Sequence, residues 1–273
     1  MNRVTLMGID GSGKTTLMRA VQAAAANRAS FCFSPDFHDI SGFPGAAESR
    51  ALTEFSRLAD SHADPCLKLA SLYLRMCAFG EAEAFLLATE RRPTLCIERH
   101  PLLDSLTYLP VYIAAVKRSG ARPETSDATL ARIAQDHPEV AGHVAAAIAR
   151  RNGRLGITDA SASGIANYCM AFGGYAPADF VRALSRDYQT GLPNVLLYLD
   201  VPPSLAFARI GARGKPLEAH ESLENLIRLD HLARSKFSSF EALGVSCHTL
   251  VVSGLPEADV VRGVTRHFDA AGP

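Results

Sequence analysis

The stretch GIDGSGKTT, residues 8–16, decides the fold that we expect of this chain. It follows the short apolar run RVTLMGI and leads into the alanine-rich run KTTLMRAVQAAAANRA, which predicts a strand, a glycine loop and a helix in succession. Glycines let the backbone N–H groups of such a loop turn toward a phosphate group, and the helix adds the positive end of its dipole. The stretch therefore predicts a site for the phosphates of a nucleotide.

The loop satisfies the pattern G-x-x-x-x-G-K-[ST] through Gly8, Gly13, Lys14 and Thr15. In this pattern the lysine reaches the β- and γ-phosphates, and the threonine hydroxyl binds Mg²⁺. We therefore expect a P-loop, or Walker A, site that uses ATP and Mg²⁺. The residues expected to bind the nucleotide are Gly8, Asp10, Gly11, Ser12, Gly13, Lys14, Thr15, Thr16 and Arg209.

Glu98 is the second acidic group that the sequence offers to this site. It ends the apolar run PTLCIE, and open α/β sheets bind their ligands at the carboxyl ends of their strands. A carboxylate there can orient magnesium-bound water or contact the acceptor, so Thr15 and Glu98 are the expected metal-site residues. The alternative is an exposed charge at a strand end.

Strands alternate with helices along most of the chain. Apolar runs at 29–34, 93–98, 194–200 and 246–252 predict further strands, and helical patterns cover 66–90, 204–214, 223–240 and 256–268. Such alternation favours a parallel sheet with helices on both faces. Residues 111–173 interrupt this alternation of strands and helices with alanine-rich helical segments, and they predict an inserted helical subdomain or lid.

Composition excludes several classes of function. The 273 residues hold 28 Lys and Arg against 28 Asp and Glu, so no overall field favours nucleic acid or an acidic membrane. Six cysteines without CxxC pairs indicate a reducing compartment. No leader precedes the first strand, and no apolar run has the length of a membrane span. We expect a cytoplasmic enzyme of one domain.

Three cations predict a lid over the transferred phosphate. Arg209 and Arg213 are four residues apart and share a helix face, and Lys215 follows just past Gly214. Cations on a helix end and its loop could clamp a phosphoryl group during transfer. The alternative is an ordinary basic helix end that satisfies the helix dipole.

In the order of its glycine loop, its acidic strand end and its basic lid, the chain resembles the thymidylate kinase and deoxynucleoside kinase superfamily of P-loop kinases. GIDGSGKTT looks like the thymidylate kinase phosphate loop, Asp10 included. LYLRM followed by LCIERH is similar to a helix and strand of the family, and LPNVLLYLDVPPSLAFARIGARGK is similar to a later strand and an arginine-bearing lid. The likeness covers residues 1–108 and about 175–270.

The resemblance implies a three-layer P-loop kinase fold over 1–273, with 111–173 as a helical insertion and 209–220 as the lid. It also implies a homodimer as a possible assembly. By position, Arg75 would bind acceptor phosphate, and Glu98 with Arg99 would form the catalytic pair. In a nucleoside kinase, Arg75 and Arg99 would instead engage the transferred group.

The chain departs from the family on the acceptor side. Asp10 favours a thymidylate kinase, whereas the spacing from Glu98 to Asp104 in ERHPLLDSLTY looks more like a deoxynucleoside kinase. Where the family has Glu-Pro or Arg-Glu-Pro after the second strand, this chain has FSPDFHD. Ser34 takes the carboxylate position there, and Asp36 or Asp39 is its candidate substitute.

Asp36 is the residue that we expect to bind the acceptor hydroxyl or act as its base; the alternative is an Asp that stabilises the turn after Pro35. The residues expected to act in catalysis are Lys14, Asp36, Glu98, Arg99, Arg209, Arg213 and Lys215. Those expected to bind the acceptor are Asp10, Asp36, Phe37, Arg75, Arg99 and Asp104.

We therefore expect an ATP- and Mg²⁺-dependent kinase that transfers the γ-phosphoryl group of ATP to a nucleotide or nucleoside. One alternative is a kinase of a non-nucleotide metabolite or antibiotic-like alcohol, which the SPDFHD loop and the insertion motivate. A second alternative is a regulatory NTP-binding switch. It is disfavoured because the ERH and RIGARGK elements resemble those of kinases and because no NKxD motif occurs.

Overall fold

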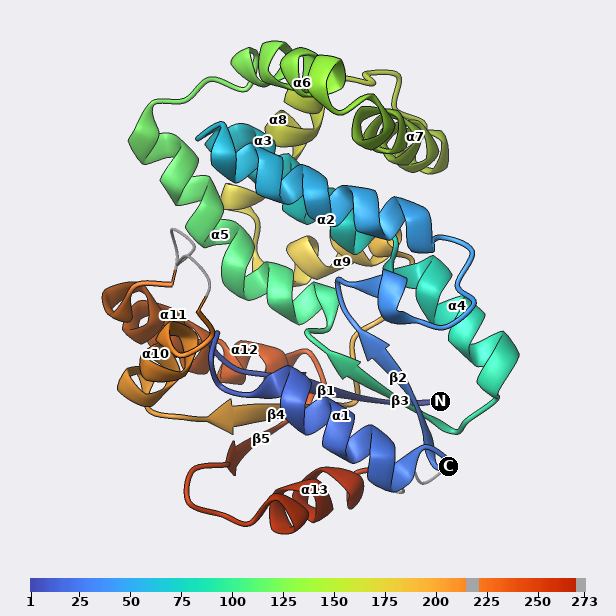
Figure 1. Cartoon of the computed structure of the whole chain (residues 1–273), viewed down its shortest axis with the longest axis vertical. Helices are drawn as coiled ribbons and strands as arrows, with labels where there is room; N and C mark the ends of the chain where they lie inside the picture. Colours follow the sequence, from blue (N-terminus) through green and yellow to red (C-terminus); the bar gives the residue numbers. More distant parts are fainter. Residues whose placement is uncertain (215–220, 269–273) are drawn as a thin grey trace. The chain divides into compact units, whose positions relative to one another are not determined.

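The computed structural model describes residues 1–214 and 221–268 (Figure 1). The chain divides into two compact units, each with its own set of contacts. The sheet unit consists of Met1–Phe33, Leu86–Leu103 and Leu192–Pro273, and the helical unit consists of Ser34–Phe85 and Asp104–Gly191. In the described part of the chain, no helix is both long enough and apolar enough to cross a membrane.

The sheet unit contains a five-stranded sheet in the order β2-β3-β1-β4-β5, and every pairing is parallel. The predicted α/β class with a parallel sheet is therefore confirmed. The strands are β1 (Asn2–Met7), β2 (Ala29–Phe33), β3 (Thr94–Glu98), β4 (Val195–Asp200) and β5 (Ser246–Val251). The helices of this unit are α1 (Lys14–Ala25), α10 (Pro203–Gly211), α11 (Leu223–Ser235), α12 (Phe237–Ala242) and α13 (Glu257–Thr265).

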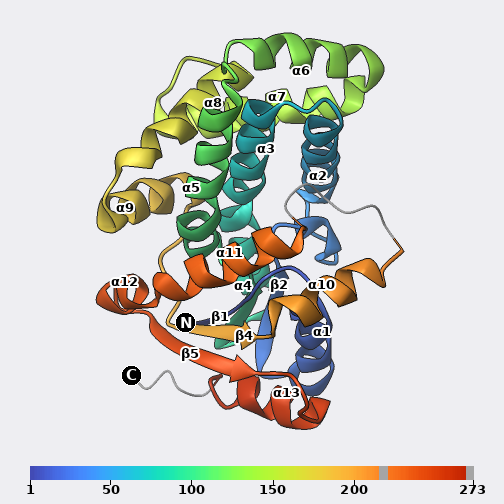
Figure 2. The ribbon, with the colours of Figure 1, turned by 90° about the vertical axis from the view of Figure 1, so that its left-hand side faces the viewer.

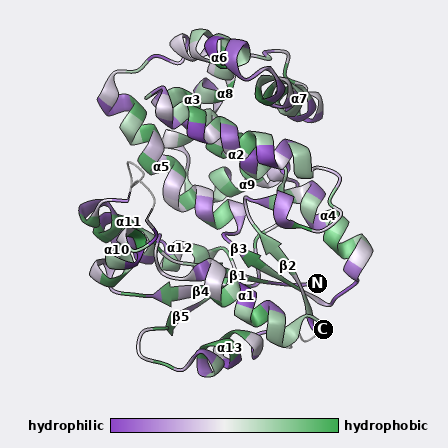
Figure 3. Ribbon diagram, in the orientation of Figure 1, coloured by the Kyte–Doolittle hydropathy of each residue, from purple (hydrophilic) through white to green (hydrophobic). Residues whose placement is uncertain are grey.

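Helices cover both faces of the sheet within this unit. On one face, α1 and α13 lie side by side (Figure 2) and bury the side chains that β1, β3 and β4 direct toward them. On the other face, Tyr198 of β4 donates a hydrogen bond to Asp230 of α11 at 2.8 Å, and its ring packs on Phe237 of α12. The inner strands are buried and mostly apolar, and Figure 3 shows hydrophobic residues along β2 and β3, whereas β5 is largely exposed.

The helical unit contains α2 (Ala46–Ser61), α3 (Pro65–Cys77), α6 (Thr125–Asp136), α7 (Pro138–Leu155), α8 (Ala162–Ala171), α9 (Pro177–Tyr188) and the short turns η1 (Phe37–Asp39) and η2 (Phe172–Gly174). Helices α4 (Phe79–Glu90) and α5 (Pro101–Ser119) run from one unit into the other along the chain. Residues 111–173 are mostly helical, as their composition predicts. The structure groups them with a second segment, Ser34–Phe85, so the helical unit is larger than the predicted insertion.

Local signals explain where several of these helices begin. The Asp64 side chain accepts a hydrogen bond from the Leu67 backbone N–H at 2.9 Å, and Pro65 occupies the first turn of α3. Two predicted helices are each divided in the structure. The helical pattern over 66–90 forms α3 and α4, and the pattern over 223–240 forms α11 and α12, which meet at Lys236.

A buried polar cluster joins four helices of the helical unit. The Arg151 side chain of α7 is fully buried, donates to the Tyr73 hydroxyl at 3.0 Å, and lies over the Tyr168 ring with 4.2 Å from its Cζ to the ring centroid. Both tyrosine hydroxyls donate to Asp187 at 2.7 Å. Burial is the main cause that raises the pKa of Tyr168 to about 12. Asp187 also forms an ion pair with the more exposed Arg186, at 3.5 Å between Oδ1 and Nε.

Candidate functional site

The glycine loop, residues 8–13, presents an open helix N-terminus at the carboxyl end of β1. Gly13 is the residue before α1 and has φ +90, a left-handed conformation that glycine adopts without a steric cost. Among the described residues, no side chain caps this helix. The first backbone N–H groups of α1, beginning at Lys14, therefore have no acceptor within the helix and can bind an anion.

Lys14 points into the glycine loop rather than into solvent. Its Nζ donates to the carbonyl oxygens of Gly8 and Ile9, each at 2.9 Å, and lies 3.7 Å from Oδ1 of Asp10. The side chain is buried. The loop thus places a full positive charge beside the N-terminus of α1, where the phosphates of a nucleotide are expected.

The two residues predicted to serve a metal ion lie in direct contact. The Thr15 hydroxyl donates to Oε1 of Glu98 at 2.8 Å. Parallel pairing of β1 with β3 sets Leu6 opposite Glu98, which brings the carboxylate to the start of the loop. Hydroxyl and carboxylate oxygens are ligands that suit Mg²⁺. Among the described residues, no group of three or more His, Cys, Asp or Glu side chains could hold a metal by protein ligands alone.

Arg99 and Asp10 form an ion pair next to this contact. Arg99 has φ +56, an uncommon conformation for a residue other than glycine, and its backbone N–H donates to the Leu6 carbonyl oxygen at 3.0 Å. The following residue, His100, donates its backbone N–H to the Thr5 hydroxyl at 3.1 Å. These bonds hold the turn after β3, so that Arg99 reaches Asp10 of the glycine loop.

A cavity of about 340 Å³ opens beside the loop. Its polar lining comes from Ser12, Gly13, Thr16, Arg209 and Glu257. Leu199, Val252 and Leu255 line it with apolar surface. Arg209 of α10 is close to the helix N-terminus, because a Cβ built on Gly13 would lie only 3.9 Å from its Nη1.

The other predicted lid residues are described only in part. Arg213 lies just beyond α10, with its Nη1 3.5 Å from Oε1 of Glu221. Lys215 lies outside the described residues, as does the second half of the predicted lid, 215–220. The lid therefore stays a prediction.

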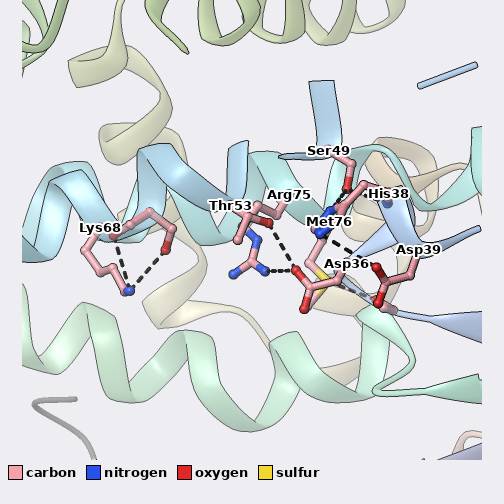
Figure 4. A network of polar contacts seen from close by, with 10 residues as sticks. Asp36, His38, Asp39, Ser49, Thr53, Lys68, Arg75 and Met76 are labelled. Atoms are coloured by element: carbon pink, nitrogen blue, oxygen red, sulfur yellow. Dashed lines mark hydrogen bonds and ion pairs between the residues drawn. The ribbon is translucent and has the colours of Figure 1, made fainter. Parts of the chain in front are cut away.

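Of the residues predicted to bind the acceptor, Asp36 and Arg75 form an ion pair within the helical unit (Figure 4). Nη2 of Arg75 donates to Oδ1 of Asp36 at 2.7 Å, and the same oxygen accepts a hydrogen bond from the Thr53 hydroxyl at 3.0 Å. Thr53 lies in α2, a helix in which the sequence predicts no functional residue. It lies four residues beyond Ser49 on that helix, and Ser49 in turn contacts His38.

Two other residues predicted to bind the acceptor are placed in the interior of the helical unit. Phe37 is fully buried, and its ring packs edge-on against Phe79. Its assignment to acceptor binding stays a prediction. Asp104 is buried in the first turn of α5.

Replacing Gly11 by alanine should disturb the loop mainly through a clash with the backbone of Ala206. A Cβ at Gly11 would lie 2.3 Å from the carbonyl oxygen of Ala206 in α10, and Gly11 has φ +78. We expect the free energy of unfolding, measured by chemical denaturation, to fall by about 2–4 kcal/mol, from overpacking and from the left-handed backbone together.

Gly120→Ala is the matched control for Gly11→Ala. Gly120 has φ +65, and no described atom lies within 4 Å of a Cβ placed there. This variant should therefore lose only the backbone contribution, about 1 kcal/mol. Equal losses in the two variants would mean that the close approach to Ala206 carries no cost.

Comparison of the chain with protein-family models gives no match, and comparison with curated proteins gives no significant one. The resemblance to thymidylate and deoxynucleoside kinases therefore rests on the sequence motifs of this chain and stays a prediction.

Proposed function

We propose that this chain is an ATP- and Mg²⁺-dependent kinase with a P-loop kinase fold, which transfers the γ-phosphoryl group of ATP to a small-molecule acceptor. One observation carries the proposal. The open N-terminus of α1, the Lys14 ammonium group and the contact between Thr15 and Glu98 all lie at the carboxyl end of β1 and its neighbour β3. This combination suits the phosphates of a nucleotide and their metal ion.

The order of the strands supports the same assignment. The chain leaves β1 through α1 toward β2 on one side of the sheet, and it later reaches β4 and β5 on the other side. Open α/β sheets bind their ligands at such a change of direction, outside the carboxyl ends of the strands. The glycine loop stands at this point.

Each donor-side residue has a role that follows from its position. The backbone N–H groups of the first turn of α1 would bind phosphate oxygens. The Lys14 ammonium group would give up its hydrogen bonds to the Gly8 and Ile9 carbonyl oxygens and donate to the β- and γ-phosphates instead. Arg209 would add positive charge beside Gly13. The cavity next to the loop, with apolar surface from Leu199 among others, would receive the nucleoside part of the donor.

Thr15 and Glu98 fit a magnesium site in which the nucleotide completes the coordination. Bound Mg²⁺ would neutralise charge on the phosphates during transfer. The hydrogen bond between the two side chains orients the Thr15 hydroxyl oxygen in advance. The protein supplies few ligands of its own, as is usual for Mg²⁺ bound with a nucleotide.

Asp36 is the proposed acceptor residue. Its carboxylate can accept a hydrogen bond from the attacking hydroxyl and take up the proton, while Arg75 and Thr53 hold the carboxylate in place. A regulatory switch would need no such group.

We assign the activity to the cytoplasm because all six cysteines are free thiols.

Measurement of ADP formation tests the proposal. The purified protein is incubated with ATP and Mg²⁺, alone and with separate nucleosides, nucleotides, sugars and amino alcohols, and phosphorylated products are identified by mass spectrometry. We expect ADP formation that depends on one class of acceptor and stops when Mg²⁺ is chelated. Turnover that no acceptor changes would contradict the kinase assignment and favour the regulatory switch.

A further inference from the structure

The Thr5 side chain is a polar group in the interior of the sheet unit to which the proposed function assigns no role. It is fully buried in β1, where β1 and β3 lie side by side (Figure 1). Its hydroxyl donates a hydrogen bond to the Ile97 carbonyl oxygen at 3.1 Å and accepts one from the His100 backbone N–H at 3.1 Å. One side chain of β1 is therefore bonded to β3 at two points, before and after the end of that strand.

The two bonds enclose the two residues of β3 and its turn that contact the glycine loop and the start of α1. The Glu98 carboxylate accepts a hydrogen bond from the Thr15 hydroxyl at 2.8 Å, and Arg99 forms an ion pair with Asp10. No other residue lies between the two bonded points along the chain. The Thr5 hydroxyl thus holds the backbone on either side of both contacts.

The backbone at Arg99 needs such support. Arg99 has φ +56, a left-handed conformation that persists in a residue other than glycine only where the surroundings hold it. Its own N–H donates to the Leu6 carbonyl oxygen at 3.0 Å, a bond that any residue at position 6 would supply. The bond on the next N–H, that of His100, requires an acceptor in the side chain at position 5. Thr5 therefore supplies a bond to this turn that the backbone of β1 alone would not.

Packing gives no reason for a hydroxyl at position 5. Valine has nearly the same shape as threonine, is also enriched in strands, and has no polar group to bury. A buried threonine loses the water that its hydroxyl would bind, so it gains over valine only through the hydrogen bonds that it makes. In this chain those bonds reach the turn that carries Glu98 and Arg99, which connects Thr5 to the proposed site.

We propose that Thr5 is a positioning residue for the phosphoryl transfer. Its hydroxyl fixes the turn after β3, and this turn directs Glu98 to the Thr15 hydroxyl. The same turn directs Arg99 to Asp10. The inference rests on the proposed kinase function. Thr5 acts through these residues from the interior of the sheet, as groups behind a metal site orient the ligands of the metal.

The first test replaces Thr5 by valine, cysteine and serine. Thr5→Val removes both hydrogen bonds and should lower ADP formation about tenfold at a fixed, subsaturating Mg²⁺ concentration, with half-saturation at a higher Mg²⁺ concentration than in the wild type. Thr5→Cys offers only a weak sulfur donor and acceptor, so it should change in the same direction. Thr5→Ser keeps the hydroxyl and should retain the magnesium dependence of the wild type. Thermal unfolding checks that each variant is folded. If serine shifted the magnesium dependence as far as cysteine or valine does, the hydroxyl would have no positioning role.

Thr94→Val is the matched control for Thr5→Val. Thr94 is also a buried strand threonine, and its hydroxyl donates to the Phe268 carbonyl oxygen at 2.8 Å. It lies at the amino end of β3, away from the turn that carries Glu98. Its magnesium dependence should coincide with that of the wild type. An equal shift in the two variants would overturn the inference, because the loss of any buried strand hydroxyl would then suffice.

A binding measurement separates this inference from the proposed function. Calorimetry gives the affinity for a non-hydrolysable ATP analogue with Mg²⁺ in the wild type, Thr5→Val, Glu98→Gln and the double variant. Because Thr5 acts in part through Glu98, Thr5→Val should weaken binding about tenfold in the wild-type background and about threefold or less beside Glu98→Gln. Equal losses in the two backgrounds would overturn the inference alone. Absence of magnesium-dependent binding in the wild type would overturn the proposed function, and the inference with it.

Discussion

We expect Lys14→Ala to lower the kcat for the proposed phosphoryl transfer by about 10²–10³-fold, the cost of removing one donor from a group of charges arranged around a reacting phosphate. The Lys14 Nζ lies inside the glycine loop, 2.9 Å from the carbonyl oxygens of both Gly8 and Ile9. Residues 8–13 of the loop contain no lysine or arginine that could replace its positive charge. Steady-state ADP formation with saturating ATP and acceptor measures the effect.

Lys68→Ala is the control for Lys14→Ala. Lys68 is another poorly exposed lysine, which bonds to Ser56 and Asp60 in the helical unit. Its removal should leave kcat within a few-fold of wild type. Thermal unfolding of both variants checks that each is folded. Retention of turnover in a folded Lys14→Ala variant would mean that the glycine loop does not hold the transferred phosphate.

Glu98→Gln should lower the rate of transfer by about 100-fold at a fixed, subsaturating Mg²⁺ concentration, because groups that orient a metal ligand typically contribute 10–100-fold to metal affinity or activity. The glutamine keeps an oxygen that can accept the Thr15 hydrogen bond, which is 2.8 Å long in the wild type, but it loses the negative charge. A titration of rate against Mg²⁺ should show half-saturation at a higher concentration than in the wild type.

Asp200→Asn provides the matched control for Glu98→Gln. Asp200 also stands at the carboxyl end of a strand, but it pairs with Arg234 of α11 at 2.6 Å. Its Mg²⁺ titration should coincide with that of the wild type. An equal change of the magnesium dependence in both variants would mean that any negative charge at a strand end has this effect. Glu98 would then not be assigned to the magnesium site.

The strands and the glycine loop could be predicted because their signals are local. Leu95, Cys96 and Ile97 are fully buried within β3, so the strand must be a continuous apolar run that is visible in the sequence. The glycine loop is likewise visible in the sequence, because its motif is a single continuous stretch, residues 8–16. The contact of Thr15 with Glu98 then follows from parallel pairing of the strands that carry them.

The acceptor side was harder to predict because it is built by contacts between distant segments. Thr53 reaches Asp36 only after α2 packs beside η1, and no motif marks that helix. Phe37 has the same hydrophobic character whether it faces a ligand or the core, so its burial against Phe79 depends on tertiary structure. The break at Lys236 between α11 and α12 is marked by neither glycine nor proline.

The central place of β1 in the sheet has a consequence for how the protein is made. Val4 pairs with Cys96 on one side and with Val195 on the other, so the strand that carries the glycine loop acquires its second neighbour only after most of the chain has been synthesised. Pairing between such distant residues is slow, and unpaired strands are prone to aggregate. During synthesis on the ribosome, one edge of β1 therefore stays unpaired until β4 has been made, and we expect the yield of folded protein to depend on chaperones that shield it.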